Sequence, residues 1–355
     1  MNDTKFYYDK PIFGIDIGFN SIKVMQVDGN SKRGEHVTGY GVIDLDKSAM
    51  EEGLIVDPEK IAKSIHELFE SNIVGDITTR RVAVAIPASK TFNRTMQFPK
   101  ISKDSELDEA VRYEAEQYIP ANIDELYLDY GVITKGDKGT EVLATAVPKK
   151  VVNSYMDTMH LLGLEPIAME TTISSSGRLF LHSEQNDSPT ILIDFGSVSS
   201  DITIFDKTMV VTGTVSGGGD NFSELISKRL NVSAQEAQII KTKYGLGVSK
   251  KQDEIIQAIK PILDQLVKEI KRMIRYYEER KTSEDSIGQI VTLGGGANMP
   301  GLSEYLTDAL RLPVRMCDPW QSLKFGKLQP PNAIEKSMYV TVAGLALIKP
   351  EELFA

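Results

Sequence analysis

The sequence predicts an α/β fold made of two related halves that face each other across a cleft. Strand-like runs rich in β-branched residues alternate with segments of helical periodicity from one end of the chain to the other. The pattern that begins the folded part, residues 13–27, returns from residue 190 as a second strand, acidic turn and strand. Residues 15–21 and 193–199 share the pattern I-D-x-G-x-x-S, and each copy leads into a further strand and then helices. Chance similarity of so short a pattern is the alternative, but two related halves account better for the shared order.

Composition indicates an ordinary globular protein. The chain of 355 residues is long enough for two or three domains. Its net charge of −10 lowers the expectation of nucleic-acid binding, because no long stripe of lysine and arginine is present. Cys317 is the single cysteine, so no intrachain disulfide can form. Residues 1–12 lack a signal-peptide core and no run of about 18 apolar residues occurs, so we expect a cytoplasmic protein that does not insert into the membrane.

The first half contains strands, helices and caps in a regular order. Residues 13–18 and 22–29 read as two strands around a short turn. Asp57 and Pro58 then begin a helix, as an N-cap and a proline in the first turn. The apolar face of this helix is Ile61, Ile65, Leu68 and Phe69. Further elements are expected as a strand at 80–89, a helix at 107–120, strands at 125–133 and 141–148, and a helix at 151–163.

The second half adds glycine-rich turns to the same alternation. A glycine triplet at 217–219 opens an amphipathic helix, and a capping box at 233–236 starts another. A long helix with an apolar face is expected from Gln252 to Arg280, bent or broken near Pro261. The strand at 289–293 leads through three glycines into a helix started by Pro300.

The glycine-bearing acidic turns have the composition of a phosphate site. Glycine lets backbone N–H groups approach an anion closely. Short polar donors and one cation accompany the glycines: Asn20, Ser21, Lys23 and Ser199. Asp16 and Asp194 would repel a phosphate unless a divalent cation such as Mg²⁺, held by one or two carboxylates and the nucleotide, bridges them to it. The sequence therefore predicts that the two turns form the phosphate end of one nucleotide site.

Each of these loops also has a simpler interpretation. Residues 294–296 would serve as a plain strand-to-helix connection, and residues 217–219 as a flexible hinge. Asp16 could cap its own turn, as aspartate often does. The combination of the loops in this order favours the nucleotide site.

The order of four segments resembles the actin-like ATPases. The segments "DIGFNSIKV", "LIDFGSVSSDITIF", "SGGGDNF" and "IVTLGGGANMPGL" are similar to the phosphate-one, phosphate-two and adenosine motifs of that superfamily. Between the two phosphate motifs, "YIP…LDY" followed by "A.PK..V…L..LGL.P" looks like the PilM family, the cytoplasmic actin-like components of type IV pilus assembly and relatives of the division protein FtsA. The resemblance covers nearly the whole chain. It implies an actin-like (ribonuclease H-like duplicated), two-lobed ATPase fold with ATP and Mg²⁺ in the cleft.

The resemblance also implies a division of the chain. Residues 1–84 would form the first lobe with the phosphate-one hairpin, and residues 85–165 an inserted small α/β subdomain, called the insert below. Residues 190–334 would form the second lobe, with the phosphate-two, ribose-contacting and adenosine motifs. Residues 166–189 and 335–355 would supply connecting helices and the return to the first lobe.

The family's nucleotide-binding positions carry over by motif. They fall on Asp16, Gly18, Asn20, Ser21, Lys23, Asp194, Gly196, Ser199, Gly217, Gly218, Gly219, Gln238, Lys241, Gly294, Gly295, Gly296 and Asn298. Asp16 and Asp194 are the implied metal ligands. Gln238 stands where relatives often have Glu and can still hydrogen-bond a ribose hydroxyl, whereas Lys241 keeps the family's lysine.

Glu170 and Asp194 are the implied catalytic residues. Glu170, in "AMETTISSSG", occupies the place where relatives put a polar residue that orients the attacking water. A carboxylate favoured by the N-terminus of the next helix is the alternative interpretation. No second base and no phosphoryl-acceptor pocket is evident, so we expect a weak ATPase at most, in which nucleotide clamps the lobes together.

In the PilM family the insert borders a groove for a membrane partner. The resemblance implies binding of the N-terminal cytoplasmic tail of a bitopic inner-membrane protein, PilN, with other pilus components as further partners. Segments 91–99 and 113–120 would line the groove. Its candidate anchors are Phe92, Phe98, Tyr113 and Tyr118. The small core of the insert is the alternative place for each aromatic. A protein of this kind would be peripheral at the inner face of the cytoplasmic membrane.

Other functions share this fold. An FtsA-like division protein usually ends in an amphipathic membrane-binding helix, for which the ending "LALIKPEELFA" is short. A small-molecule kinase would need an acceptor pocket with a catalytic aspartate in the first lobe, and no compelling candidate is present. A chaperone would need a large substrate-binding domain after the ATPase. We therefore expect a pilus scaffold first, a division protein second and a kinase third.

Overall fold

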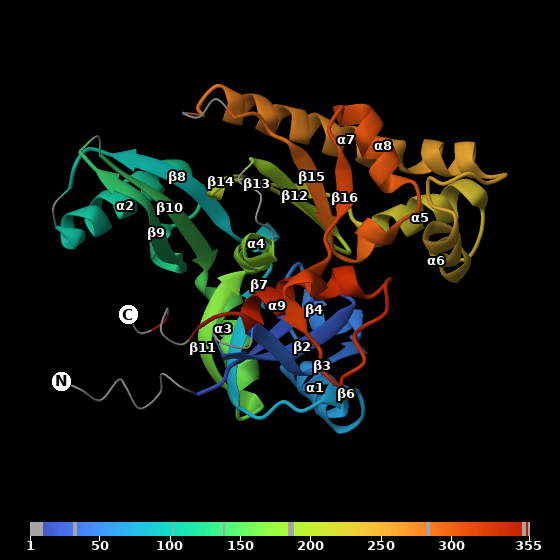
Figure 1. Cartoon of the computed structure of the whole chain (residues 1–355), viewed down its shortest axis with the longest axis horizontal. Helices are drawn as coiled ribbons and strands as arrows, with labels where there is room; N and C mark the ends of the chain where they lie inside the picture. The colour runs from blue at the N-terminus through green and yellow to red at the C-terminus, as the bar shows by residue number, and fades with distance from the viewer. Residues whose placement is uncertain are drawn as a thin grey trace.

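A computed structural model describes residues 10–30, 34–101, 103–137, 139–183, 188–281, 285–349 and 353. Two lobes, each built on a β-sheet, lie one above the other, and a smaller sheet lies beside the upper one (Figure 1). The lower, blue lobe contains the first strands of the chain and is called the first lobe, and the upper, yellow and orange one is the second lobe. Residues 1–9 and 31–33, which belong to the expected first lobe, and 350–352 and 354–355, at the expected return to it, lie outside the described residues.

The first-lobe sheet has the strand order β11-β7-β1-β2-β3-β17, and β6 also pairs with β3. The bounds are β1 (Phe13–Ile17), β2 (Ser21–Asn30), β3 (Gly34–Asp44), β6 (Ile73–Gly75), β7 (Arg81–Ile86), β11 (Glu165–Thr171) and β17 (Leu323–Lys324). β1 and β2 form the antiparallel hairpin that the sequence predicts. β7 and β11 run parallel to β1, and all of β7 is buried, as expected of a central strand covered on both faces.

Helices α1 (Pro58–Ser71) and α3 (Lys149–Leu161) pack together and share a core with this sheet. The carboxylate of Asp57 accepts a hydrogen bond from the Lys60 amide at 3.1 Å, which confirms the predicted N-cap. Ile61, Ile65 and Leu68 are buried as predicted. Two short strands, β4 (Met50–Glu51) and β5 (Leu54–Ile55), precede α1.

The second-lobe sheet has the order β14-β13-β12-β15-β16. Its strands are β12 (Thr190–Phe195), β13 (Ser199–Asp206), β14 (Thr208–Ser216), β15 (Gln289–Leu293) and β16 (Val314–Met316). Its helices are α5 (Gly219–Leu230), α6 (Ala234–Lys243), α7 (Gln252–Glu278) and α8 (Leu302–Leu310). α7 continues through Pro261 as one helix, so the predicted break is absent; its apolar positions stay buried against the sheet on both sides of the proline.

The third sheet, called the insert sheet, has the order β8-β10-β9 and is covered by α2. The bounds are β8 (Phe92–Phe98), α2 (Asp104–Tyr118), β9 (Leu126–Gly136) and β10 (Gly139–Pro148). This unit is narrower than the expected range of 85–165, because α3 buries Val151, Tyr155 and Met159 in the first-lobe core. At the other end, β17 pairs with β3, so the chain rejoins the first-lobe sheet before residue 335.

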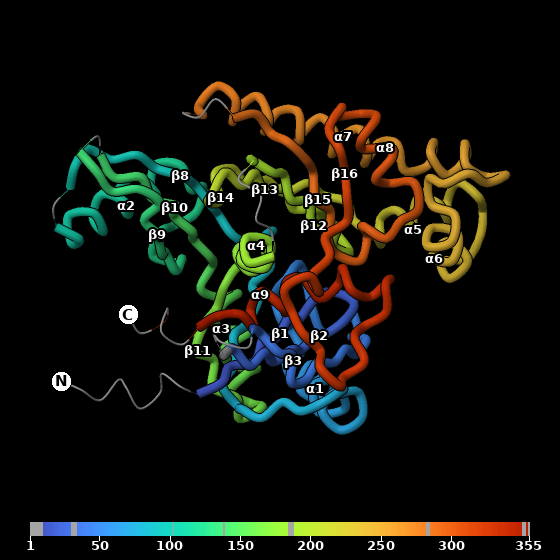
Figure 2. Tube along the Cα trace, viewed as in Figure 1, coloured from blue at the N-terminus to red at the C-terminus, as the bar shows by residue number. Residues whose placement is uncertain are grey.

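Helices α4 (Thr172–Ser183) and α9 (Val340–Ala346) lie between the lobes (Figure 2). They cross closely at small residues: a β-carbon at Gly344 would lie 1.8 Å from the carbonyl oxygen of Ser175. The hydroxyls of Ser176 and Thr341 are 3.2 Å apart in the same crossing. Buried side chains of both helices join the two large sheets in one continuous core. The two lobes therefore meet through this helix pair, and a cavity remains beside it.

Candidate functional site

A cavity of about 630 Å³ separates the two lobes. The β1–β2 turn lines it from the first lobe, and the β12–β13 turn and the end of β15 line it from the second. The first turn of α5, part of α6 and residues 334–338 complete the wall. Of the predicted nucleotide-binding residues, all but Gly217 and Gly218 line this cavity.

The two acidic turns have the same backbone geometry. The Gly18 amide donates to the Ser21 carbonyl at 3.0 Å, and the Gly196 amide donates to the Ser199 carbonyl at the same distance. The turns come together in the cavity from opposite lobes, although 177 residues separate Asn20 from Ser197, whose side chains are hydrogen-bonded at 2.9 Å. The structure thus brings the two copies of the repeated pattern face to face.

The strand register gives the two turns different electrostatics. Asp16 is paired with Lys23 across the first hairpin, and their side chains form a 3.6 Å ion pair. In the second hairpin the same position opposite Asp194 is occupied by Asp201. One turn therefore carries a compensated carboxylate and the other carries two carboxylates.

Burial and mutual repulsion perturb the second pair. The pKa of Asp194 is raised to about 7, chiefly by burial and then by Asp201 and Asp16, while Lys23 acts in the opposite direction. Burial raises the pKa of Asp201 to about 6, against the hydrogen bond that it accepts from the Thr214 hydroxyl at 2.6 Å. Too little positive charge lies near the two ionised carboxylates to compensate them. A cation bound between the turns would therefore stabilise the ionised forms of both Asp194 and Asp201.

The donor set fits a hydrated divalent cation. Asp16, Asp194 and Asp201 all line the cavity. Within the described ranges, no group of three histidine, cysteine or acidic side chains is close enough to hold an ion alone. Mg²⁺ usually takes one or two carboxylates and keeps water and phosphate oxygens as its other ligands, which suits this arrangement.

The three glycines after β15 let the backbone approach the carboxylate. Gly294 has φ +82°, and a β-carbon there would lie 2.3 Å from Oδ1 of Asp194. Asn298 donates to the Ile334 carbonyl at 2.8 Å and to the Ser337 hydroxyl at 2.9 Å. Its amide nitrogen therefore holds the neighbouring segment in place, while its side chain also lines the cavity.

The glycine triplet before α5 acts mainly through close packing. A β-carbon at Gly218 would lie 2.4 Å from the Gly196 carbonyl oxygen, and one at Gly217 would lie 2.6 Å from Ile262. The amides of Gly219 and Asp220 donate to carbonyls of the β12–β13 turn at 2.9 and 2.8 Å. Gly217 and Gly218 thus support the phosphate-two turn from behind, and Gly219 reaches the cavity.

Helix α6 contributes two polar side chains. Gln238 accepts a hydrogen bond from the Ser223 hydroxyl at 2.7 Å and remains exposed. The buried Lys241 ammonium donates to the Gly219 carbonyl at 2.6 Å, and burial lowers its pKa to about 8. Both residues line the cavity from the second lobe, at the positions that the family resemblance predicts.

Glu170 does not line the cavity in the described part of the chain. It is the penultimate residue of β11, and both carboxylate oxygens accept hydrogen bonds from the Arg178 guanidinium on α4. This bidentate pair gives Glu170 a structural partner that neither of the two sequence interpretations included. Its water-orienting role stays a prediction.

Sequence reasoning missed Asp201 and Asp220. Asp201 lies seven residues after Asp194, as Lys23 lies seven residues after Asp16, so the alignment of the two hairpins contained the signal for it. Asp220, in the first turn of α5, lines the cavity and contacts the first lobe. No sequence signal pointed to that contact, because it joins residues 200 positions apart.

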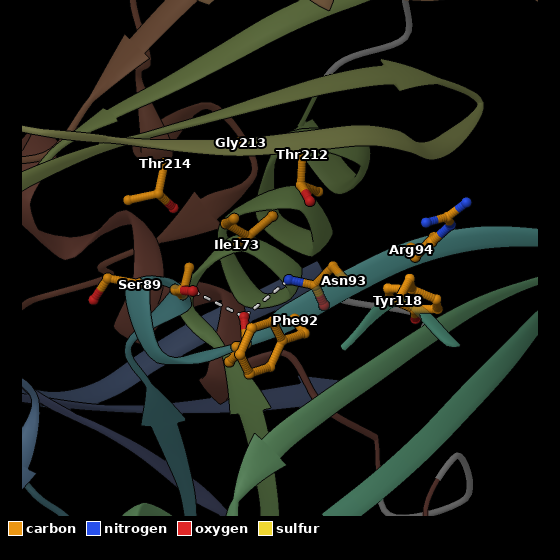
Figure 3. Close-up of a pocket in the computed structure, with 11 residues that line it drawn as sticks. Ser89, Phe92, Asn93, Arg94, Tyr118, Ile173, Thr212, Gly213 and Thr214 are labelled. Atoms are coloured by element: carbon orange, nitrogen blue, oxygen red, sulfur yellow. Dashed lines mark hydrogen bonds between the residues drawn. The ribbon is translucent and has the colours of Figure 1, made fainter. Parts of the chain in front are cut away.

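A second cavity of about 360 Å³ lies between β8 of the insert sheet and β14 of the second lobe (Figure 3). Two of the four predicted partner anchors, Phe92 and Tyr118, line it, and the Arg94 guanidinium stacks over the Tyr118 ring at 4.4 Å. Phe92, Tyr118 and Phe98 all pack against the insert core, and Phe98 lies outside this cavity. Tyr113 is 69 % exposed on α2 and lies outside this cavity.

Comparison with known proteins gives one family over nearly the whole chain. The family model described as type IV pilus assembly protein PilM matches residues 14–349. Among curated proteins, cell division protein FtsA of Bacillus subtilis is 22% identical over 359 residues, covering 90% of this chain and 80% of its own. FtsA of Enterococcus hirae is 24% identical, covering 87% and 78%.

Solved structures confirm the predicted two-lobed actin-like fold. The chain aligns with the PilM–PilN type IV pilus biogenesis complex at a TM-score of 0.82 and 23% identity, covering 96% of this chain and 98% of the other. It aligns with MreB5 of Spiroplasma citri bound to ADP at a TM-score of 0.55 and 11% identity, covering 97% of each chain. Of the helices that the structure describes, none has both the length and the hydropathy to cross a bilayer.

Proposed function

Because this chain belongs to the family of type IV pilus assembly protein PilM, we propose that it is an ATP-binding scaffold of a type IV pilus assembly machine. It holds Mg·ATP between its lobes and binds the N-terminal cytoplasmic tail of a PilN-like bitopic membrane protein beside the insert sheet. It works in the cytoplasm at the inner face of the membrane, to which the partner recruits it.

The observation that supports nucleotide binding is the meeting of the two acidic turns. Asp16 and Asp194 come from opposite lobes and line one cavity together with the glycines after β15. A bound Mg²⁺ would neutralise charge on the nucleotide's phosphates. Asp16 and Asp194 would hold the ion together with its water ligands, while Lys23 and the amides of the β1–β2 turn would bind phosphate oxygens.

Nucleotide in this place favours the closed arrangement of the lobes. A ligand that touches both turns binds the closed state more tightly than an open one, and that difference shifts the population. Weak hydrolysis at most is expected, because Glu170, the residue expected to orient the attacking water, is paired with Arg178 and does not line the cavity in the described part of the chain. Occupancy rather than turnover would then carry the signal.

The cavity between β8 and β14 supports the partner site. Its wall combines the Phe92 and Tyr118 rings with the hydroxyls of Thr212 and Thr214 and the Arg94 cation (Figure 3). The Tyr118 hydroxyl is buried and has no hydrogen-bond partner among the described residues, so it can bond to a group that enters the cavity. An extended peptide with one apolar anchor and free backbone groups suits such a wall.

Two tyrosines of α2 give a matched test. The protein, purified with or without Mg·ATP, is mixed with solubilised membranes, and retained bitopic pilus proteins are identified by mass spectrometry. A synthetic peptide of the recovered cytoplasmic tail is then titrated against Tyr118→Ala and Tyr113→Ala. We expect Tyr118→Ala to weaken peptide binding about tenfold or more and Tyr113→Ala to leave it unchanged. Equal binding by both variants would exclude the β8–β14 cavity.

A division scaffold is the second candidate. The FtsA matches, which cover 90% and 87% of this chain, favour it. If the membrane experiment retains division proteins and no bitopic pilus protein, the FtsA-like function replaces the pilus function.

A further inference from the structure

Asp220 joins the two lobes across the mouth of the nucleotide cavity. Its Oδ1 accepts a hydrogen bond from the Asn20 side-chain amide at 3.0 Å, and its Oδ2 lies 2.5 Å from the Lys47 ammonium. Asn20 belongs to the β1–β2 turn, and Lys47 begins the short helix Lys47–Ala49 after β3. Asp220 belongs to the first turn of α5 in the second lobe. Two donors of one lobe thus converge on one carboxylate of the other.

The carboxylate also sets the orientation of Asn20. A carboxylate only accepts hydrogen bonds, so Asn20 must present its amide nitrogen to Asp220. The same nitrogen also donates to the Ser197 hydroxyl at 2.9 Å. The amide oxygen of Asn20 is buried, and no described residue donates a hydrogen bond to it. A buried unpartnered acceptor costs free energy, so this arrangement is favourable only while the carboxylate holds the amide nitrogen.

The groups around Asp220 are those that a phosphate would require. Asn20 lies on the turn proposed to hold phosphate, and Asp220 itself lines the same cavity. Lys241 is a second ammonium near Asp220. The Asp220 carboxylate partly offsets the lowering of the Lys241 pKa by burial. The carboxylate offers these donors the same negative oxygens that a nucleotide would offer, and it would repel a nucleotide's phosphates nearby.

We propose that Asp220 is an internal competitor of the nucleotide: it binds the Asn20 amide and the Lys47 ammonium, and the phosphates of a nucleotide must displace it from these two donors. This inference rests on the proposed nucleotide site. Only molecules in which Asp220 has released the two donors bind phosphate. The apparent association constant is therefore the intrinsic constant multiplied by the fraction of molecules in that state. The same contacts join the two lobes, so Asp220 lowers the affinity for nucleotide and links the lobes by itself.

The test removes the charge of Asp220 and keeps its shape. Binding of Mg·ATP is measured by calorimetry on the full-length protein and on Asp220→Asn, at low and high salt. We expect Asp220→Asn to bind about three- to tenfold more tightly at low salt, with a smaller gain at high salt, because the effect is electrostatic. Glu224→Gln is the control, since it removes one negative charge from the same helix in the exposed pair with Lys228. It should leave the affinity unchanged.

A double-mutant cycle shows whether Lys47 changes partner. Lys47→Met should weaken Mg·ATP binding by itself, and Asp220→Asn should gain less in the Lys47→Met background. Hydrogen exchange adds a readout without nucleotide: the amides of the β1–β2 turn should exchange faster in Asp220→Asn than in the unaltered protein. Mg·ATP should restore their protection.

The outcomes separate this inference from the function on which it rests. Equal or weaker binding by Asp220→Asn, when the unaltered protein binds Mg·ATP, overturns the competitor role and leaves the nucleotide site standing. If neither protein binds Mg·ATP, the nucleotide site and the competitor role are both overturned. An equal gain in Mg·ATP affinity by Glu224→Gln would show that the effect comes from the net charge of the protein. It would also overturn the competitor role.

Discussion

Gly294 packs directly against the carboxylate of Asp194. A β-carbon at this glycine would lie 2.3 Å from Oδ1, and the backbone has φ +82°, which residues with side chains rarely adopt. The Gly294 amide is fixed from the other side by the Ser337 carbonyl at 3.0 Å. The position of this carboxylate, whose pKa is strongly raised, therefore depends on the loop that follows the neighbouring strand β15.

Gly294→Ala should disturb both the loop and the carboxylate. We expect the free energy of unfolding to fall by about 1–3 kcal/mol, because the added carbon overlaps Asp194 and strains the backbone. The stabilisation by Mg·ATP should fall as well. Urea unfolding with and without Mg·ATP measures both effects. In the neighbouring control Gly295→Ala, the β-carbon would make an ordinary 3.7 Å contact with Met338, and the stability of the unliganded protein should be kept.

Asp194→Asn should abolish the thermal stabilisation by Mg·ATP. The amide keeps the shape of the side chain but cannot neutralise a divalent cation, so the ligand loses its anchor in the second lobe. Differential scanning fluorimetry with and without Mg·ATP measures the shift. Asp264→Asn is the matched control, because Asp264 is exposed on α7 and pairs only with Lys260 among the described contacts. An unchanged melting shift in Asp194→Asn would contradict the assignment of this residue.

The raised pKa of Asp194 predicts a pH-dependent stability without cations. The carboxyl has its ordinary pKa near 3.8 in the unfolded chain and about 7 in the folded protein, so the folded state holds the proton more tightly. This contribution is fully present below the unfolded pKa and is lost as the pH rises towards 7. Between pH 5.5 and 8 the unaltered protein should lose about 2 kcal/mol relative to Asp194→Asn.

Urea unfolding in a chelating buffer at the two pH values gives this difference. Subtracting the variant removes the titration of all groups that the two proteins share. Millimolar Mg²⁺ with nucleotide should reduce the difference, because the cation stabilises the ionised form. A difference that is the same at both pH values would show that Asp194 titrates normally.

Gly344→Ala should destabilise the junction between the lobes. The added carbon would lie 1.8 Å from the Ser175 carbonyl oxygen. This overlap can be relieved only if α4 moves away from α9. We expect a loss of about 1–3 kcal/mol in the free energy of unfolding. Gly131→Ala is the control, because nothing lies within 4 Å of its β-carbon position. Equal losses in the two variants would indicate that the crossing is not tightly packed.

Local patterns accounted for much of the fold. The cap at Asp57 and the apolar face of α1 follow from residues close together in sequence, and both are confirmed except at Phe69, which is exposed. The helix was expected to be bent or broken at Pro261; it is not broken, because burial of α7 against the sheet outweighs one lost backbone hydrogen bond, and a bend stays a prediction. The insert was expected at residues 85–165, but the insert sheet and α2 cover a shorter range. Burial in the core again decides this, because the apolar side chains of α3 pack in the core of the first lobe.

The site was predictable where chemistry repeats along the chain. The shared I-D-x-G-x-x-S pattern pointed to both acidic turns, and the structure places both in one cavity. It could not show that Arg178 holds Glu170, or that Tyr118 rather than Tyr113 faces the β8–β14 cavity. Such choices depend on which face of a helix or strand packs against a distant element.

By itself, the sequence determined the two-lobed α/β fold, the family and the two acidic turns, because periodicity, caps and a repeated motif are local properties of the chain. Only the tertiary structure decided that Gly294 touches the carboxylate of Asp194 and that Asp220 reaches across to Asn20 and Lys47. These contacts join positions far apart in sequence, and their energies depend on burial and distance, which exist only after the lobes have folded together.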